Sequence, residues 1–297
     1  MRLIQSYAAP DLQAVRLARE LEERCKAYDG LKGSLYLDPS LNFSKEIPCL
    51  FILLENETPL GVMTFFAPTQ EEAEIVGLTR PEYRRSGVFR ALTAAAARSA
   101  QQFGIPDLLF VAERQSESGV AALARLGVAL EYTEFSLRFD RSFDRKELRI
   151  PQGLTLRRAK DEDLDAMAHV SAESFHEPQE RARHFLSAAL ASNRRTQFIA
   201  LLNGEPAGIC GVGYEDGEAT IYGLGVLPAL QGRGIGRGII SLLLKELLAD
   251  DKTDILIEVN ALNASALHLY LSCGFVSETA SGYYRARAQR FLSDLAK

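Results

Sequence analysis

The chain lacks several features that mark whole classes of protein. Its 297 residues include four cysteines, none in CxxC spacing, so we expect buried reduced thiols rather than a disulfide framework. The four histidines are scattered without metal-ligand spacing, which predicts no metal site. No GxSxG elbow is present either, so the nucleophile signature of the α/β-hydrolases is missing.

A basic surface and a long apolar run are missing as well. The formal net charge of −5 argues against a nucleic-acid partner. The most apolar stretch, residues 234–248, is too short and too charged to span a bilayer, and no apolar segment follows a basic start in residues 1–12. We therefore expect no membrane partner and no signal peptide, and we place the protein in the cytoplasm.

The sequence does contain an internal repeat. Prolines and glycines recur at a constant separation of 147 residues, without a gap, in the pairs Pro59 and Pro206, Gly61 and Gly208, Pro81 and Pro228, Gly87 and Gly234, and Gly127 and Gly274. A period of this length indicates a duplicated domain rather than a solenoid. At about 150 residues per domain, the length of the chain also favours two domains.

Each copy has the same expected order of elements. In the second copy we expect strands at 197–202, 208–214, 219–226 and 255–259, and helices at 236–248 and 264–273. Asn203-Gly204 and Asp216-Gly217 are hairpin signals. Hairpins followed by strand–helix–strand predict an α/β fold, with a mixed, mostly antiparallel twisted sheet flanked by helices. We expect domains at 1–140 and 153–297, joined by a charged linker at 141–152.

The most informative segment is QGRGIGR at residues 231–237. It follows a strand-like run and opens a strongly helical one. Glycines in such a turn let backbone N–H groups approach a ligand, and the start of the helix carries about half a positive charge. The segment therefore predicts a phosphate site. An altered echo, RRSGVFR, stands at residues 84–90 of the first copy.

Two segments of the second copy together resemble the GCN5-related N-acetyltransferase (GNAT) superfamily. The pattern Q/R-x-x-G-x-G/A is met at 231–236, and N-x-x-A-x-x-L-Y-x-x-x-G-F is met at 263–275. Within the superfamily, the second domain is most similar to the ribosomal-protein N-terminal alanine acetyltransferases. The first domain resembles the superfamily more faintly. The resemblance implies two tandem GNAT-like domains, as in the group that includes mycothiol synthase.

The resemblance also implies acetyl-coenzyme A as co-substrate, and no metal. The pyrophosphate would rest on the backbone N–H groups at the start of the helix, with an arginine adding charge. The end of the preceding strand would pair with the pantetheine, and Asn263 would reach the cofactor arm, cap the helix, or do both. The implied cofactor-binding residues are Leu224, Gly225, Val226, Gln231, Gly232, Arg233, Gly234, Ile235, Gly236, Arg237 and Asn263.

Two residues are candidates for proton transfer. Tyr270 falls where the family places a phenol near the thioester sulfur, so it would protonate the departing thiolate, unless it is only a core aromatic. An amine is mostly protonated at pH 7, so a base is also needed. Glu258 lies where the alanine acetyltransferases carry a basic glutamate, although a structural ion pair is the alternative. Glu218 is the second candidate base.

The first copy carries different residues at these positions. At the offset of 147, the correspondences are Leu123 for Tyr270, Val111 for Glu258, Ser116 for Asn263 and Phe89 for Gly236. A leucine cannot protonate a thiolate, and a phenylalanine adds bulk where backbone should meet phosphate. We therefore expect a catalytically silent first domain that braces the second domain or shapes its substrate cleft.

The expected function is N-acetyl transfer from acetyl-CoA to a primary amine, by direct attack in a ternary complex on the second domain. Two alternatives stay open: a non-catalytic acyl-CoA-binding or regulatory module, and transfer of a longer acyl group. The acceptor is expected to be a small-molecule or peptide amine, selected by residues 161–195. A peptide N-terminus, a polyamine, an amino sugar and an amino acid fit that segment equally. The oligomeric state stays open.

Overall fold

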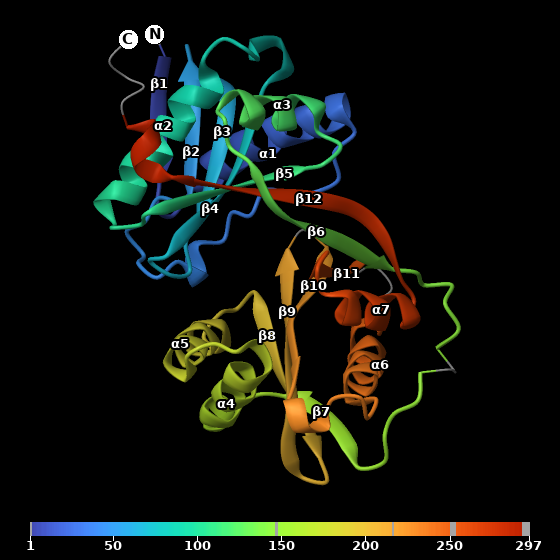
Figure 1. Ribbon diagram of the computed structural model, residues 1–297. Coiled ribbons are helices and arrows are strands. Elements are labelled where there is room, and N and C mark those ends of the chain that lie inside the picture. Colours follow the sequence, from blue (N-terminus) through green and yellow to red (C-terminus); the bar gives the residue numbers. More distant parts are fainter. Residues whose placement is uncertain (1, 146–147, 216, 250–253, 293–297) are drawn as a thin grey trace. The chain divides into compact units, whose positions relative to one another are not determined.

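The chain folds as two compact units. The computed structural model describes residues 2–145, 148–215, 217–249 and 254–292. Unit 1 comprises Met1–Thr133 and Thr279–Lys297, and unit 2 comprises Glu134–Glu278. Each unit is a twisted, mostly antiparallel sheet with helices on both faces (Figure 1). The fold class expected from the sequence is therefore confirmed.

Unit 1 has the strand order β1-β2-β3-β4-β5-β12. Only β4 and β5 are parallel neighbours, and the other pairs are antiparallel. Its elements are β1 (Arg2–Tyr7), α1 (Leu12–Asp29), η1 (Pro39–Leu41), β2 (Leu50–Glu55), β3 (Thr58–Phe66), β4 (Glu72–Thr79), η2 (Pro81–Tyr83), α2 (Val88–Gln102), β5 (Asp107–Glu113), α3 (Glu117–Arg125), the start of β6 (Leu130–Phe139), the end of β12 (Phe275–Arg287) and η6 (Ala288–Phe291).

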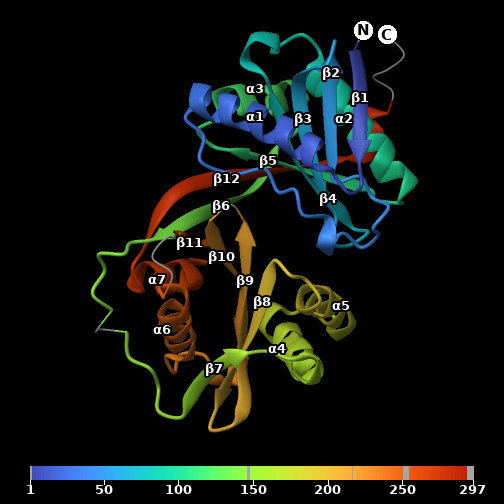
Figure 2. The same cartoon turned by 180° about the vertical axis from the view of Figure 1, so that it is seen from behind.

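The two faces of the unit 1 sheet are covered by different helices. Side chains alternate along a strand, so Leu50 and Ile52 of β2 pack with α1, whereas Phe51 and Leu53 pack with α2. Figure 2 shows α1 in front of this sheet and α2 behind it. Because both faces are covered, β2 is apolar throughout rather than alternating, and all of its residues but the last are buried.

Unit 2 has the strand order β6-β11-β10-β9-β8-β7. Here β10 and β11 are the parallel pair. Its elements are the end of β6, β7 (Leu154–Arg158), η4 (Asp161–Asp163), α4 (Leu164–Phe175), α5 (Gln179–Leu190), β8 (Arg195–Leu202), β9 (Glu205–Glu215), β10 (Glu218–Val226), η5 (Pro228–Leu230), α6 (Ile235–Leu247), β11 (Asp254–Asn260), α7 (Ala264–Ser272) and the start of β12.

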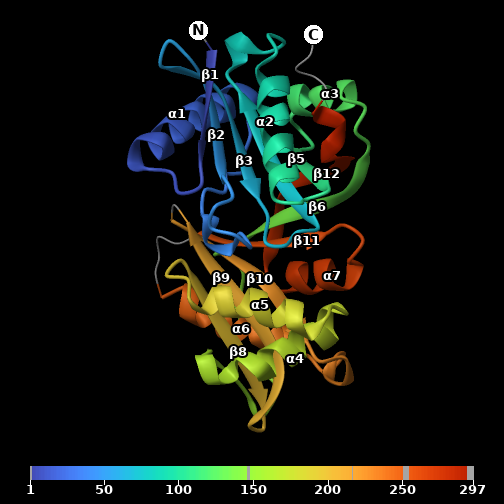
Figure 3. The same ribbon diagram turned by 90° about the vertical axis from the view of Figure 1, so that its left-hand side faces the viewer.

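The unit 2 sheet also separates two helical layers. Ile209 of β9 packs with α4 and α5, whereas its neighbour Cys210 packs with α6 and α7. Figure 3 looks onto α4 and α5 lying over the strands of this unit. The elements agree with those expected from the sequence to within about three residues. The four cysteines are buried free thiols, as expected.

Both copies share a tight hairpin turn. Asn203 and Gly204 have φ values of 53° and 90°, the conformation that the Asn-Gly signal predicts. In unit 1 the same turn is made by Asn56 and Glu57, with φ values of 48° and 67°. The fold thus keeps the turn where the glycine is lost. Asp216, in the second hairpin signal, lies outside the described residues, as do residues 146 and 147 of the expected linker.

The last strand of each half of the chain pairs in the sheet of the other unit. In β6, the residues from Glu134 to Arg138 pair with β11 of unit 2. In β12, the residues from Ser281 to Arg287 pair with β5 of unit 1. The units therefore differ from the contiguous domains expected at 1–140 and 153–297. The two strands occupy the same position in the repeat, so the local sequence does not reveal that they are exchanged.

Ending the chain after Glu278 should unfold unit 1 and leave unit 2 folded. The truncation removes the partner of β5, and it takes Tyr284, Ala286 and Phe291 out of the unit 1 core. Limited proteolysis should therefore cut freely within residues 1–133 while residues 134–278 stay protected. A chain ending after Leu292 is the control and should protect both units. Equal protection of residues 1–133 in the two chains would contradict the exchange.

Candidate functional site

The sheet of unit 2 opens between its two parallel strands. Pairing of β10 with β11 ends at Ile221 and Ile257, although the strands continue to Val226 and Asn260. At this point β10 carries a bulge, where its register with β9 shifts between Tyr222 and Gly225. A bulge bends its strand and leaves backbone groups unpaired. The carboxyl ends of β10 and β11 therefore frame an opening with free backbone donors and acceptors.

The glycine-rich segment lies directly after β10 and η5. Gly232 and Gly234 have φ values of 73° and 77°, in the left-handed region that favours glycine. No side chain caps the first turn of α6, and a Cβ built on Gly232 would meet nothing within 4 Å. The N–H groups at the start of this helix are thus accessible, which fits a pyrophosphate group.

Gly236 lets the start of α6 approach its neighbours closely. A Cβ at this position would lie 3.1 Å from Leu269 of α7 and about 4 Å from Leu224 and Val226 at the end of β10. The Gln231 side-chain amide donates to the Val226 carbonyl, at 3.1 Å. The side chain of Gln231 therefore holds the loop to the strand.

The two arginines of the segment differ in their surroundings. Arg237 is half-buried and donates from Nη2 to the Ser272 hydroxyl of α7, at 3.0 Å. Arg233 is exposed to solvent at the turn itself. Arg233 is thus the better placed of the two to add charge to the loop, whereas Arg237 also joins two helices.

Tyr270 and Asn263 lie at the two ends of α7. Tyr270 is buried in the unit 2 core, and this burial raises the pKa of its phenol to about 12. Asn263 accepts a hydrogen bond from the Ala266 N–H at 3.0 Å, so it is the N-cap of the helix. Its side-chain NH₂ group remains on the exposed side, so the cap does not prevent a contact with a cofactor.

Glu258 lies on the other side of β11 from the core. Ile257 and Val259 pack into the core with Tyr270, so the alternation of the strand turns Glu258 to the face covered by α4 and α5. Register places it opposite Ser136 of β6, diagonal to Glu134 on the same face. The residue retains solvent-accessible surface, but the protein atoms around its carboxyl group still desolvate that group. Desolvation, followed by the Glu134 charge, raises its pKa to about 7.

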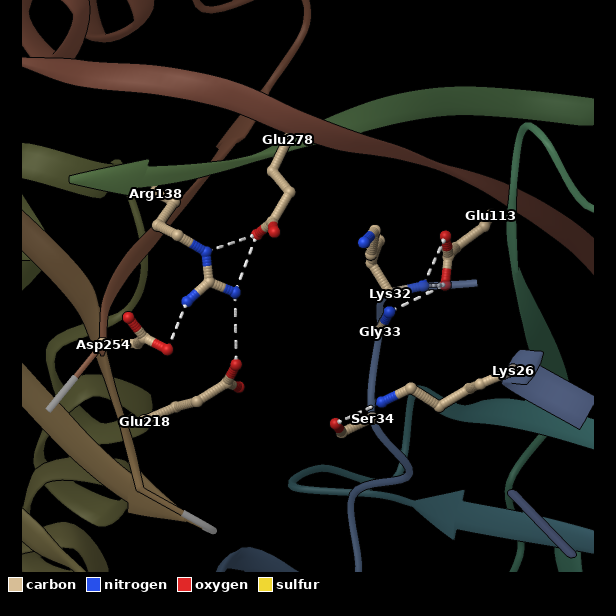
Figure 4. Close-up of polar contacts among 9 residues, drawn as sticks. All are labelled: Lys26, Lys32, Gly33, Ser34, Glu113, Arg138, Glu218, Asp254 and Glu278. Carbon is tan, nitrogen blue, oxygen red and sulfur yellow. Dashed lines mark hydrogen bonds and ion pairs between the residues drawn. The ribbon is translucent and has the colours of Figure 1, made fainter. Parts of the chain in front are cut away.

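Glu218 has a structural partner. Arg138 of β6 contacts three carboxylates, those of Glu218 at 3.4 Å, Asp254 at 2.9 Å and Glu278 at 2.9 Å (Figure 4). Glu218 and Asp254 stand at the first paired positions of β10 and β11, away from the opening. Of the two candidate bases, Glu258 is therefore the one that lies beside the opening.

Several charges of residues 161–195 are paired within the segment. Arg183 contacts Asp165 at 2.8 Å, and Glu177 accepts from the Ser171 hydroxyl at 2.8 Å and lies 3.9 Å from Arg181. These contacts join α4 to α5 and to the residues between the two helices.

The structure adds residues that the sequence reasoning missed. Tyr222 stands just before the bulge, hydrogen-bonded to Gln197 of β8 and edge-on to the Phe185 ring of α5 at 6.2 Å. Ser174 of α4 lies over Gly225, at the other end of the bulge. The short run Gly223-Leu224-Gly225 was the available signal, because glycine inside a strand often marks a bulge.

In unit 1 the corresponding opening is filled. Pairing of β4 with β5 also ends early, at Ile75 and Phe110. The Phe89 ring lies against Gly77 of β4, 2.6 Å from where a Cβ would stand, and its centroid is 6.3 Å from that of Phe110. Phe89 thus places a ring at the position where Gly236 has no side chain in unit 2.

Unit 1 differs from unit 2 in two further respects. Leu123 is buried in the core at the position of Tyr270, with no group that could donate a proton. Glu113, at the end of β5, accepts from the backbone N–H groups of Lys32 at 3.0 Å and Gly33 at 2.7 Å (Figure 4). This carboxylate fixes the chain that follows α1 to the end of β5.

The strand β4 also lacks the bulge of β10. Ile75 and Ile221 hold the same register position but are 146 residues apart, whereas Thr79 and Val226 are 147 apart. The extra residue of β10 is offset by a shorter hairpin before it. The repeat therefore does contain a gap, which the matched prolines and glycines did not reveal.

Two absences hold for the part of the chain that the structure describes. No group of three or more His, Cys, Asp or Glu side chains there could hold a metal ion. No helix there is long and apolar enough to cross a membrane.

Comparisons with known proteins agree on one family. The acetyltransferase (GNAT) family model matches twice, at residues 15–128 and 163–275. A mycothiol acetyltransferase of Clavibacter michiganensis is 29% identical over 96% of this chain and 94% of its own. The [ribosomal protein bS18]-alanine N-acetyltransferase of Escherichia coli is 31% identical over 41% of this chain and 80% of its own. A tandem GNAT protein of the clavulanic acid pathway, 18% identical, superposes with a TM-score of 0.73 over 97% of this chain and 99% of its own.

Proposed function

Since the chain belongs to the acetyltransferase (GNAT) family, we propose that unit 2 transfers the acetyl group of acetyl-CoA to a primary amine. One observation carries this proposal. The opening between β10 and β11 lies beside an uncapped helix start, with Tyr270 and Glu258 on opposite faces of β11. This arrangement supports a role for one residue as proton donor and for the other as proton acceptor.

The residues at the opening fit acetyl-CoA. The N–H groups from Gly232 to Arg237 would hold the pyrophosphate, with Arg233 adding charge. The unpaired backbone of Leu224–Val226 would pair with the pantetheine, and the NH₂ group of Asn263 would reach the same arm. Bound acetyl-CoA would supply an activated thioester carbonyl.

The two titratable residues would then divide the proton transfers. Glu258, with its pKa raised to about 7, is suited to take a proton from an ammonium group near neutral pH. Tyr270 has a pKa of about 12, so it stays protonated and can supply a proton to a departing thiolate. Under this proposal, Glu258 accepts the proton of the amine and Tyr270 protonates the departing thiolate.

Gly236→Phe, which places the first copy's residue in the second copy, should strongly weaken cofactor binding without unfolding the protein. The ring would fill the space next to Leu224 and Val226, as Phe89 fills it in unit 1. We expect the Kd for coenzyme A, measured by calorimetry, to rise at least tenfold, with a near-native circular dichroism spectrum. The matched control, Phe89→Leu in unit 1, should bind coenzyme A like the wild type. Unchanged binding by Gly236→Phe would place the cofactor elsewhere.

The acceptor class is best found by a thiol-release screen. The named relatives are a mycothiol acetyltransferase and a ribosomal-protein bS18 alanine N-acetyltransferase, so the screen should include a peptide that begins with alanine. An amino sugar, a polyamine and an amino acid complete the classes that residues 161–195 leave open. Coenzyme A binding without thiol release for any class would favour the non-catalytic alternative. Faster release from a longer acyl-CoA than from acetyl-CoA would favour the longer acyl group.

We further propose that unit 1 is catalytically silent. Three features of unit 1 support this: the Phe89 ring fills its opening, Leu123 replaces the phenol, and Glu113 holds a loop over the end of β5. The strand β6 begins in unit 1, and its residues Glu134–Arg138 pair with β11 in unit 2, so the two units share one strand. We infer a structural role for unit 1.

A further inference from the structure

The hydroxyl of Ser174 is buried without a hydrogen-bond partner. Its Oγ is one of four such side-chain atoms in the described part of the chain, with those of Asn42, Thr79 and Arg80, and the only one in unit 2. A buried donor left without a partner costs stability, so it needs an explanation such as an absent ligand. Ser171, one turn earlier on α4, shows the usual outcome, because its hydroxyl donates to Glu177 at 2.8 Å.

The position of Ser174 links this hydroxyl to the opening. A Cβ built on Gly225 would lie 2.9 Å from the Ser174 Cβ, 3.0 Å from its Oγ and 3.2 Å from the Phe175 ring. Glycine is therefore required at 225 for α4 to come this close. Gly225 is also where the register of β10 resumes after the bulge. The unpartnered hydroxyl thus stands over the bulge, where the strand has unpaired backbone groups.

We propose that the Ser174 hydroxyl donates a hydrogen bond to the acetyl carbonyl oxygen of bound acetyl-CoA. The inference rests on the proposed function of unit 2, and it gives the buried hydroxyl of Ser174 a hydrogen-bond acceptor. A carbonyl oxygen is the acceptor that such a hydroxyl lacks. Coenzyme A without the acetyl group has no such oxygen, so the two ligands should distinguish this role from a structural one.

The test compares acetyl-CoA with coenzyme A on the full chain. For Ser174→Ala, calorimetry should show a Kd for acetyl-CoA about tenfold higher than that of the wild type, as loss of one hydrogen bond implies, with an unchanged Kd for coenzyme A. Without ligand, the melting temperature of Ser174→Ala should equal or exceed that of the wild type, because a buried unpartnered group has been removed.

Ser171→Ala is the matched control. It should lower the melting temperature, because it removes the hydrogen bond between Ser171 and Glu177, and it should leave the ratio of the two Kd values unchanged. Equal weakening of both ligands by Ser174→Ala, or no weakening of either, would overturn the proposed contact. If the wild type binds neither ligand, the proposed function of unit 2 fails instead, which is a separate result.

Discussion

Tyr270→Phe should lower kcat for amine-dependent thiol release about 100-fold or more at pH 7.5, while the Kd for acetyl-CoA changes less than twofold. A positioned general acid contributes roughly 10² to 10⁴ to a rate. Burial raises the pKa of this phenol to about 12, so it holds its proton across the working pH range. Phenylalanine keeps the ring, and therefore the packing with Phe275, whose centroid is 6.3 Å away.

The same variant also tests whether unit 1 is silent, because Tyr270 belongs to unit 2 and activity from unit 1 would survive its substitution. Its control is Tyr284→Phe, which removes a phenol hydroxyl from unit 1, where it accepts from Arg114 at 3.3 Å. The control should turn over like the wild type. An unchanged kcat in Tyr270→Phe would remove the phenol from the mechanism. Because unit 1 needs β12 to be complete, both variants are best measured in the full chain rather than in an isolated half.

Glu258→Gln should lower kcat/KM for the amine about 100-fold or more near pH 7.5 and should remove the acidic limb of its pH profile. The wild-type profile should fall below a pKa of about 7, because protonated Glu258 cannot take a proton from the amine. Glutamine has no such titration, so its residual rate should lack this limb. Steady-state kinetics from pH 5.5 to 9 measure both effects.

The control for this variant is Glu218→Gln. Glu218 belongs to the ion pairs of Arg138, so its loss should leave the acidic limb in place. A limb that disappears in Glu218→Gln but persists in Glu258→Gln would exchange the roles of the two residues.

The raised pKa of Glu258 also has a stability consequence with a definite sign. An unfolded chain ionises this carboxyl near 4.5, whereas the folded protein does so near 7, so the folded state binds more protons between these values. Stability contributed by the neutral carboxyl is therefore lost as pH rises through this window. Glu258→Gln should melt at a higher temperature than the wild type at pH 8 and at a similar temperature at pH 4.

The fold could be predicted from the sequence because its signals are local. Asn203-Gly204 specifies a hairpin turn, and the apolar spacing along α6 specifies a helix face. The family pattern added the candidate residues Tyr270 and Asn263, whose places on α7 follow from sequence spacing alone. Phe89 was also recognisable, because a large side chain cannot stand where Gly236 permits close approach.

The remaining features depend on contacts between distant segments. The bulge of β10 appears only when its register with β9 is known, because a shorter hairpin restores the spacing of the repeat. The partner of Glu218 comes from β6, 80 residues earlier, so its ion pair left no local signal. Ser174 is an ordinary helix residue until Gly225 is placed beneath it.

The exchange of β6 and β12 bears on how this protein is made. Unit 1 cannot be completed on the ribosome until the final strand has been synthesised, which at 5–20 residues per second is about ten seconds or more after β5. During that interval β5 has an open edge, and β6, which holds the same place in the repeat, is the first strand available to cover it. During synthesis, β6 and β12 are therefore alternative partners for β5. The native sheet of unit 1 forms when β12 pairs with β5.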